Sequence, residues 1–157
     1  MTDTVTLPLQ GYKVLVTRPA HQSDQLARLI EQQGGEAIRF PAIEIVPVPA
    51  MQWQSWQPQE TDWLVFVSRN AVEAFCQGFS TALPANIQLV AAGDGTAQAM
   101  REHGLRVNLQ PALSNGSDGL LPLPEWQQMQ QQHVVIVRGD GGRERMAETL
   151  RARGAKI

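Results

Sequence analysis

The stretch that decides the fold is residues 133–157, HVVIVRGDGGRERMAETLRARGAKI. Its run of β-branched residues, 134–137, is typical of a strand that is buried on both faces of a sheet. A glycine-rich turn follows, and then Met146, Ala147 and Leu150 recur at the spacing of one helix face. The stretch therefore predicts a strand, a turn, a helix over 143–153 and, after Gly154, the start of another strand.

The same unit stands near the start of the chain, where residues 12–16 lead into a Thr-Arg-Pro turn and a helix that closes at Gly34. Aligning Arg18 with Arg138 gives an offset of 120 (138 − 18), which also places Gly34 on Gly154. Such a register indicates either an internal duplication or only the form that any two strand-turn-helix units share. Both readings lead to the same fold class.

Further units lie between these two. Strands are expected at 36–40, 63–67, 87–92 and from 105, and helices after residue 70, up to His103 and from Ser117. Asn70 and Glu73 are spaced as in a capping box. The proline-punctuated residues 42–49 fit an edge strand or an extended connector. The alternation predicts an α/β fold with parallel sheets flanked by helices, doubly wound and flavodoxin-like, in two domains.

Composition excludes several classes of function. A formal net charge of −2 argues against a nucleic-acid binder. Cys76 is the single cysteine, so no disulfide framework is expected and a reducing cytoplasm is the natural compartment. No leader pattern or membrane-spanning apolar run is present. The histidines are scattered and show no metal-ligand spacing among themselves or with Cys76, so no metal site is expected. No cofactor-binding pattern is found either, so no cofactor is expected.

The chemistry is concentrated in the strand-to-helix turns, which gather at the carboxyl edge of a parallel sheet. Small residues at a helix N-terminus, hydroxyl groups and arginines together favour an anion. The candidates are Thr17, Arg18, Ser68, Arg69, Asn70, Gly93, Gly95, Thr96, Arg138, Gly139 and Arg143. The alternative is that they are helix caps, turn glycines and solvated charges. Neither a dinucleotide fingerprint nor a phosphate loop occurs.

These residues resemble the uroporphyrinogen-III synthase family over essentially the whole chain. The matching segments are residues 14–19 (VLVTRP), 40–45 (FPAIEI), 66–75 (FVSRNAVEAF), 92–97 (AGDGTA), 117–121 (SDGLL) and 137–139 (VRG) with 143–144. The resemblance implies cyclisation of hydroxymethylbilane to uroporphyrinogen III, with loss of water, inversion of the last pyrrole ring and no cofactor. It places Ser68 and Thr96 at substrate-binding positions and adds Ser117 to the candidates.

The resemblance also concerns how much of a full-length family member this sequence contains. Full-length members, expected to be monomers, continue beyond the point that corresponds to Ile157, and the second copy of the repeat stops where the first continues. We therefore expect residues 1–43 to open a first, incomplete domain, and residues 44–157 to form most of a second. The expectation is that this chain lacks full synthase activity. The other hypothesis is a non-catalytic α/β ligand-binding or receiver-like module.

Overall fold

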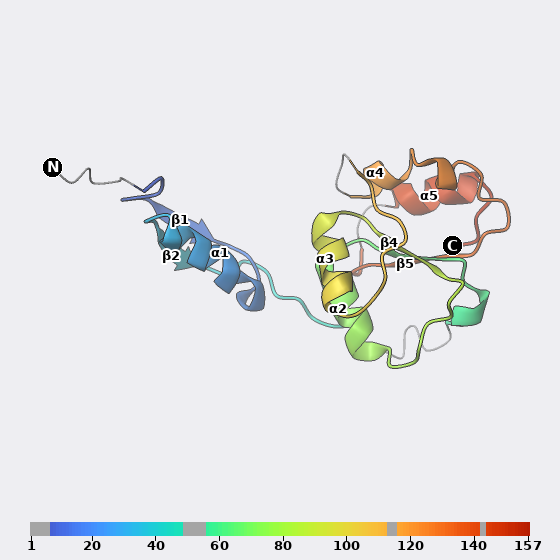
Figure 1. Cartoon of the computed structure of the whole chain (residues 1–157), viewed down its shortest axis with the longest axis horizontal. Coiled ribbons are helices and arrows are strands. Elements are labelled where there is room, and N and C mark those ends of the chain that lie inside the picture. Colours follow the sequence, from blue (N-terminus) through green and yellow to red (C-terminus); the bar gives the residue numbers. More distant parts are fainter. Residues whose placement is uncertain (1–6, 49–55, 113–115, 142–143) are drawn as a thin grey trace. The chain divides into compact units, whose positions relative to one another are not determined.

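The computed structural model describes residues 7–48, 56–112, 116–141 and 144–157. They form two compact units, unit 1 over Met1–Val46 and unit 2 over Pro47–Ile157. Figure 1 shows both as mixtures of helices and strands. The α/β fold class expected from the sequence is confirmed, because every paired strand in the described residues is parallel to its neighbour. The division into an incomplete first and a nearly complete second domain stays a prediction.

Unit 1 consists of β1 (Lys13–Val16), α1 (Ala20–Gln32) and β2 (Glu36–Arg39). The two strands pair in parallel from Lys13↔Glu36 to Val16↔Arg39. The helix buries Ala27 and Ile30, one turn apart on the face that meets the sheet. It starts after Pro19, which presets a helical φ, and ends before Gly34, whose φ of +83° favours glycine.

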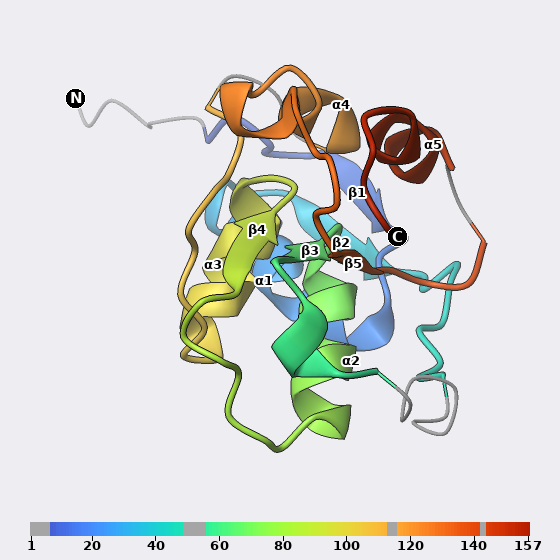
Figure 2. The ribbon, with the colours of Figure 1, turned by 90° about the vertical axis from the view of Figure 1, so that its right-hand side faces the viewer.

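Unit 2 is built on a sheet of β3 (Trp63–Phe66), β4 (Gln88–Ala91) and β5 (Val134–Val137), in the order β4-β3-β5. Its helices cover both faces. Figures 1 and 2 show α2 and α3 on one side of the sheet and α4 and α5 on the other. Their bounds are η2 (Pro58–Glu60), α2 (Arg69–Gly78), α3 (Asp94–Glu102), α4 (Ser117–Leu120), η3 (Pro124–Trp126) and α5 (Arg145–Ala152).

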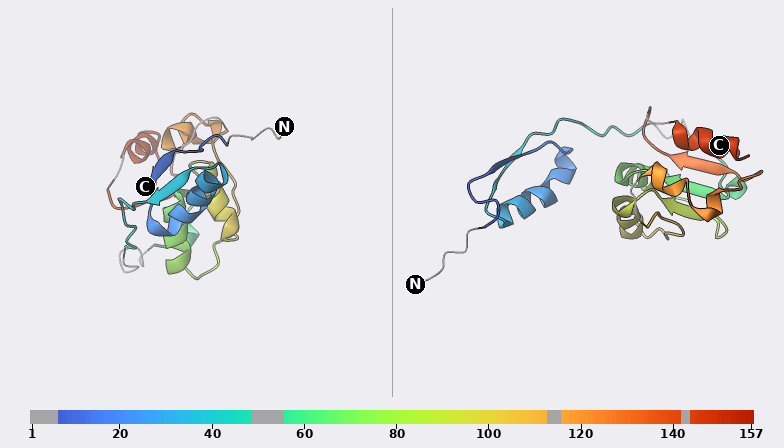
Figure 3. Two further views of the ribbon diagram at one scale, coloured as in Figure 1. Left: turned by 90° about the vertical axis from the view of Figure 1, so that its left-hand side faces the viewer. Right: turned by 90° about the horizontal axis from the view of Figure 1, so that it is seen from above.

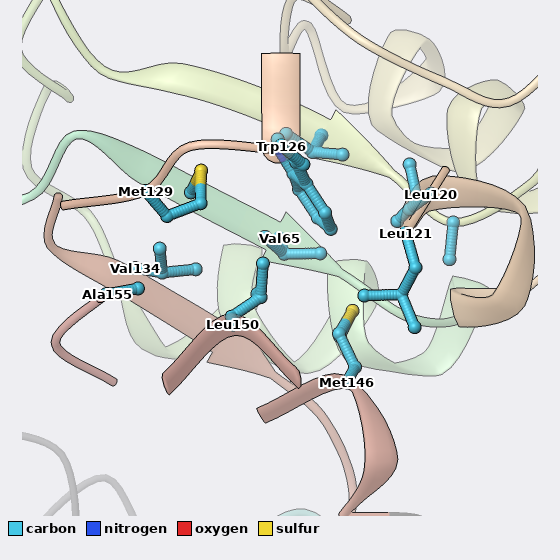
Figure 4. Packing of buried hydrophobic residues seen from close by; sticks show 11 residues of the cluster. Val65, Leu120, Leu121, Trp126, Met129, Val134, Met146, Leu150 and Ala155 are labelled. Atoms are coloured by element: carbon cyan, nitrogen blue, oxygen red, sulfur yellow. The ribbon is translucent and has the colours of Figure 1, made fainter. Parts of the chain in front are cut away.

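Two apolar clusters form the core of unit 2, one on each face of the sheet, because successive strand residues point to opposite faces. Val65 belongs to the cluster under α4 and α5, whereas Leu64 and Phe66 belong to the cluster under α2 and α3. Figure 4 shows the first cluster, in which Leu150 of α5 lies beside Val65 and Met146 lies near Leu121; the fully buried Trp126 belongs to the same cluster. A strand buried on both faces explains the uninterrupted apolar run in its sequence.

The register of the repeat recurs in the backbone hydrogen bonds at an offset of 120. Leu9 N–H donates to the Gln33 carbonyl (2.9 Å), and Met129 N–H donates to the Arg153 carbonyl (3.2 Å). The bonds Tyr12→Leu9, Gly34→Glu31, Gly35→Ile30 and Glu36→Tyr12 have the counterparts Gln132→Met129, Gly154→Arg151, Ala155→Leu150 and Lys156→Gln132. A generic strand-turn-helix unit requires no such match in the turn before the strand.

The same turn holds a matched pair of unusual backbone conformations. Gly11 has a φ of +83° and Gln131, 120 residues later, has a φ of +61°, the one positive φ of a non-glycine among the described residues. Glycine takes this conformation without strain, and glutamine does not. The second copy therefore keeps the turn of the first although its residue is less suited to it.

Two expectations about elements differ from the structure, and one pair of alternatives is decided. Residues 105–107 form no strand, because the Asn108 side-chain oxygen takes the Leu89 N–H (2.9 Å) and only the bridge Val90↔Leu109 is made. Residues 42–48 form no strand either, which leaves the connector of the two alternatives. Helix α5 begins at Arg145 instead of residue 143.

The start of α2 is a further correction. Its cap is Ser68, not Asn70, since Ser68 Oγ accepts the Ala71 N–H at 3.1 Å. Asn70 is the second residue of the helix and therefore does not occupy the N-cap position that a capping box with Glu73 assigns to it. Ser68 is the cap because it has the extended backbone that this position requires, with φ −159° and ψ 163°.

Candidate anion site at the carboxyl edge of unit 2

The turns that follow β3, β4 and β5 lie at the carboxyl ends of parallel strands and therefore share one edge of the sheet. The start of α4 joins them, because Gly116 N–H donates to the carbonyl of Ala92, directly after β4, at 2.6 Å. Most of the candidate site residues are thus brought to one edge of unit 2. They are Ser68, Arg69, Asn70, Gly93, Gly95, Thr96, Ser117, Arg138 and Gly139.

Arg69 is held by carboxylates of its own chain. Its Nη1 lies 2.6 Å from Glu102 Oε2 at the end of α3 and 3.9 Å from Glu73, one turn along α2. The hydrogen bond from Arg69, with a second from Gln98, lowers the pKa of Glu102 below its ordinary value. The Arg69 side chain is still 29% exposed.

The turn between β4 and α3 presents backbone more than side chain. No side chain caps α3, and the N–H groups of Thr96 and Ala97 donate to the Gly93 carbonyl at 3.1 and 2.9 Å. A Cβ at Gly95 would meet no atom within 4 Å, so this glycine leaves open space above the helix start. Thr96 is 6% exposed, so this residue is buried at the helix start. The helix N-terminus carries partial positive charge toward this edge.

The turn after β5 carries a second arginine-carboxylate pair. The Arg138 guanidinium donates to Glu144 Oε1. The next residue, Arg145, lies 3.0 Å from Asp118 of α4, so adjacent residues tie the loop to the strand and to the neighbouring helix. A Cβ at Gly139 would meet nothing within 4 Å. These two ion pairs hold the end of this turn, and Gly139 leaves open space beside the end of β5.

The remaining candidates are Thr17, Arg18 and Arg143. Thr17 and Arg18 are exposed in unit 1, after β1, and Arg18 Nη2 donates to Gln22 Oε1 at 3.3 Å. Arg143 and the side chain of Ser117 lie outside the described residues. Sequence reasoning missed Glu102, Glu144 and Asp118 as partners of the arginines. The available signal was the spacing of opposite charges near helix ends, which does not say which helices face each other.

A cavity of about 510 Å³ lies beside this edge, between α4, η3 and α5. Arg145, Thr149 and Arg153 line it at successive turns of α5. Arg153 Nη1 also donates to the carbonyls of Leu121 (2.7 Å) and Trp126 (2.8 Å), which fixes the end of α5 to η3. The cavity has the size of a small-ligand pocket but is lined mainly by residues that already bind each other.

Three further observations concern metal binding, the single thiol and membrane spans. Across residues 7–48, 56–112, 116–141 and 144–157, no three His, Cys, Asp or Glu side chains come together as a metal site. Burial raises the pKa of the Cys76 thiol, which disfavours the nucleophilic thiolate. No helix in the described part combines the length and apolar character needed to cross a bilayer.

Comparison with known proteins gives consistent matches. The family model described as uroporphyrinogen-III synthase HemD matches residues 24–157. Uroporphyrinogen-III synthase of Escherichia coli K12 is 34% identical over 151 residues, which cover 92% of this chain and 61% of that protein. The enzyme of Proteus mirabilis is 30% identical, with 92% and 75% covered. A protein of Ruminiclostridium josui described as porphyrin biosynthesis protein HemD is 31% identical over 75% of this chain and 25% of its own length.

A solved structure shares the fold. The crystal structure of a mutant uroporphyrinogen III synthase from the extremely thermophilic bacterium Thermus thermophilus matches with a TM-score of 0.63 at 20% identity, and the match covers 92% of this chain and 59% of that one. The molecule is thus an α/β protein with parallel sheets flanked by helices and an arginine-rich carboxyl edge. It belongs to the uroporphyrinogen-III synthase family, and it spans 61% of the Escherichia coli relative and 25% of the Ruminiclostridium one.

Proposed function

We propose that this chain binds the linear tetrapyrrole hydroxymethylbilane at the carboxyl edge of unit 2, as part of a uroporphyrinogen-III synthase of haem biosynthesis. The observation that carries the proposal is the convergence of Ser68, Arg69 and Arg138 with the open glycine turns at one edge, in a chain of this family. The proposed reaction closes the ring with loss of water and inverts the last pyrrole. Thr17 and Arg18 would bind substrate from unit 1.

The substrate carries eight carboxylates, and two arginines of unit 2, Arg69 and Arg138, already bind carboxylates of this chain. Glu102 and Glu144 are about half exposed, and exposed ion pairs contribute little to stability because water screens them. A ligand carboxylate can therefore replace either glutamate at little cost in free energy. Guanidinium groups recognise carboxylates through two parallel hydrogen bonds, which would orient the bilane as well as hold it.

The chemistry that this edge supports is positioning and charge stabilisation. Holding the ends of the bilane together raises the effective concentration of the reacting carbons. Partial charges of fixed backbone groups and arginines act on the azafulvene-like cation and spiro intermediate that form as water leaves. We assign no side chain as general acid, and the proposed reaction uses neither a metal ion nor an organic cofactor.

The proposal distinguishes binding of hydroxymethylbilane from its conversion to uroporphyrinogen III. Because the chain spans 61% of the Escherichia coli relative, we propose that it holds the bilane without completing the inversion. The expected monomeric state of full-length members and the cytoplasmic location expected from the single cysteine stay predictions.

The decisive activity experiment supplies hydroxymethylbilane enzymatically and separates the oxidised porphyrin isomers by chromatography. Spontaneous closure gives type I, and the synthase reaction gives type III. We expect only type I with this chain and type III with the Escherichia coli relative run in parallel. Type III product above the protein-free blank would overturn the proposal that the chain alone is inactive.

The binding experiment titrates the protein with uroporphyrin III as a polycarboxylate probe and follows tryptophan emission. Arg69→Gln and Arg138→Gln should each weaken binding by roughly ten- to hundredfold, since a charge-assisted hydrogen bond is worth about 1.5–3 kcal/mol. Arg151→Gln is the matched control, because it removes one exposed charge at the opposite end of α5. No saturable binding by the unmodified chain would favour a module for another ligand.

A further inference from the structure

Helix α4 is a single turn, Ser117–Leu120, and a single turn has almost no stability of its own because nucleation of a helix is unfavourable. Its position therefore depends on contacts with other elements. At its start, Gly116 N–H donates to the Ala92 carbonyl at 2.6 Å, which brings residues 116–118 to the edge of the sheet where the candidate site lies. Whatever holds α4 therefore also places this part of the candidate site.

The other end of α4 is held by side chains from the ends of α5 and η3. The carbonyl of Leu121, the residue after α4, accepts hydrogen bonds from Arg153 Nη1 at 2.7 Å and from Gln127 Nε2 at 2.9 Å. Arg153 Nη1 also donates to the Trp126 carbonyl at 2.8 Å. One nitrogen of Arg153 thus joins α5 to the end of α4 and to η3, while the buried Leu120 side chain anchors the same turn in the core.

Helix α5 contacts α4 a second time. Arg145, the first residue of α5, forms an ion pair with Asp118 of α4 at 3.0 Å. Arg145 and Arg153 are eight residues apart, about 12 Å along a helix, whereas α4 is about 6 Å long. Figure 2 shows α4 beside α5, and the left panel of Figure 3 shows the same pair in orange and red. A contact near each end of α4 fixes both its position and its direction.

The end of α5 does not itself require an arginine. At the offset of 120, Arg153 corresponds to Gln33, and each backbone N–H donates to the carbonyls three and four residues earlier, at 3.1–3.2 Å. The helix dipole favours a cation here, but the exposed Arg151 in the same turn already supplies one. The half-buried Arg153 guanidinium is therefore explained by its bonds to Leu121 and Trp126, not by the helix end.

We propose that Arg153 is a positioning residue for ligand binding at the carboxyl edge of unit 2. Helix α5 begins at that edge with Arg145, and Arg153 follows its last residue, at the far end of the helix. Arg153 acts through the Leu121 carbonyl, which sets where residues 116–118 meet the turn after β4. This inference rests on the proposed function, because it takes the tetrapyrrole to bind at this edge. The bound polycarboxylate then depends on a guanidinium that it does not touch.

The test measures uroporphyrin III binding by isothermal titration calorimetry, because the tryptophan emission of a variant next to Trp126 would change by itself. Arg153→Gln introduces the residue that the repeat has at Gln33. It should weaken binding roughly three- to tenfold, which corresponds to about one hydrogen bond to the ligand. Arg153→Lys still donates to both carbonyls and should bind within about twofold of the unmodified chain. Arg151→Gln is the matched control, since it removes one charge from the same turn and should leave the affinity unchanged.

Hydrogen exchange of the Gly116 amide, measured without ligand, separates positioning from a general loss of stability. This amide is bonded to the Ala92 carbonyl, so its exchange reports whether the start of α4 is docked on the end of β4. Arg153→Gln should accelerate exchange at Gly116 and leave exchange at Leu64 and Val65 of β3 unchanged. A residue that only stabilised the fold would accelerate exchange at all three amides.

The proposal is overturned if Arg153→Gln binds as tightly as Arg151→Gln, or if exchange at Gly116 does not change. If the β3 amides also exchange faster, Gln127→Ala takes the place of that variant, because it removes the other bond to the Leu121 carbonyl from an exposed side chain. Gln127→Ala should shift binding and Gly116 exchange in the same directions, and no shift overturns the proposal. If the unmodified chain does not bind uroporphyrin, the proposed function fails, and exchange at Gly116 alone decides whether Arg153 holds α4.

Discussion

The turn that precedes β5 makes a quantitative prediction about Gly154. Its φ is +93°, and an added Cβ would lie 3.0 Å from the Cα and 3.4 Å from the backbone nitrogen of Gln130. Alanine in the left-handed region costs about 1–2 kcal/mol. Forcing backbone apart at a close contact costs roughly a further 1–3 kcal/mol. Gly154→Ala should therefore lower the free energy of unfolding by about 2–5 kcal/mol.

Gly104 offers a matched control within the same unit. Its φ is +72° at the end of α3, but an added Cβ would meet nothing within 4 Å. Gly104→Ala should cost only the conformational part, about 1–2 kcal/mol. The difference between the variants isolates the contact between the helix end and the turn at Gln130, because both substitutions restrict the unfolded chain alike.

Urea unfolding followed by tryptophan emission measures both values. Trp63 and Trp126 lie in or against the α5 cluster, with ring centroids 6.1 Å apart, so their emission reports on the packing of unit 2. Unchanged m-values would show that both variants unfold from the same kind of native state. Equal losses of stability in the two variants would refute this prediction, because the close approach of the added Cβ to Gln130 would then contribute nothing to the free energy of unfolding.

Three further predictions concern the core and the ion pairs. Leu150→Ala truncates a fully buried side chain and leaves a cavity, so it should lower the free energy of unfolding by about 2–5 kcal/mol in the same urea assay. A decrease below about 1 kcal/mol would contradict the packing described for Leu150. Glu144→Gln should strengthen uroporphyrin binding a few-fold by removing the competitor for Arg138, and weaker binding would instead make Glu144 a positioning residue. In an NMR titration, Glu102 should have a pKa below its ordinary value, and this pKa should return toward the ordinary value in Arg69→Gln. Because the folded-state pKa is lowered, the Arg69–Glu102 pair stabilises the fold at neutral pH. This contribution disappears as the pH falls through the lowered pKa.

The sequence predicted the elements well wherever a local pattern was sufficient. The apolar runs at β3 and β5 identify buried strands because both faces of each are covered, and the run alone carries that information. The helix ends at Gly34, Gly104 and Gly154 were likewise readable, since each glycine has the positive φ that such a stop requires.

Long-range contacts were not readable. The segment from Leu105 has strand character, but the Arg106 guanidinium donates to the carbonyls of Pro84, Ala85 and Ile87, and these bonds hold it as a loop. The arginines of the candidate site were expected to face a ligand, whereas two of them bind glutamates contributed by other segments. Such pairings depend on which helices pack against each other, and the periodicity along one helix carries no information about that.

The strand order β4-β3-β5 has a consequence for how unit 2 folds. Trp63 and Val134 pair across 71 residues, and the Asp62 carboxylate accepts the His133 N–H at 2.8 Å at the same junction. Closing a long loop before its contacts form is slow, and it favours late completion of the sheet. During synthesis, β3 and β4 leave the ribosome with one edge and one apolar face uncovered until α5 has followed. We expect this interval to be the one in which the nascent chain depends most on chaperones.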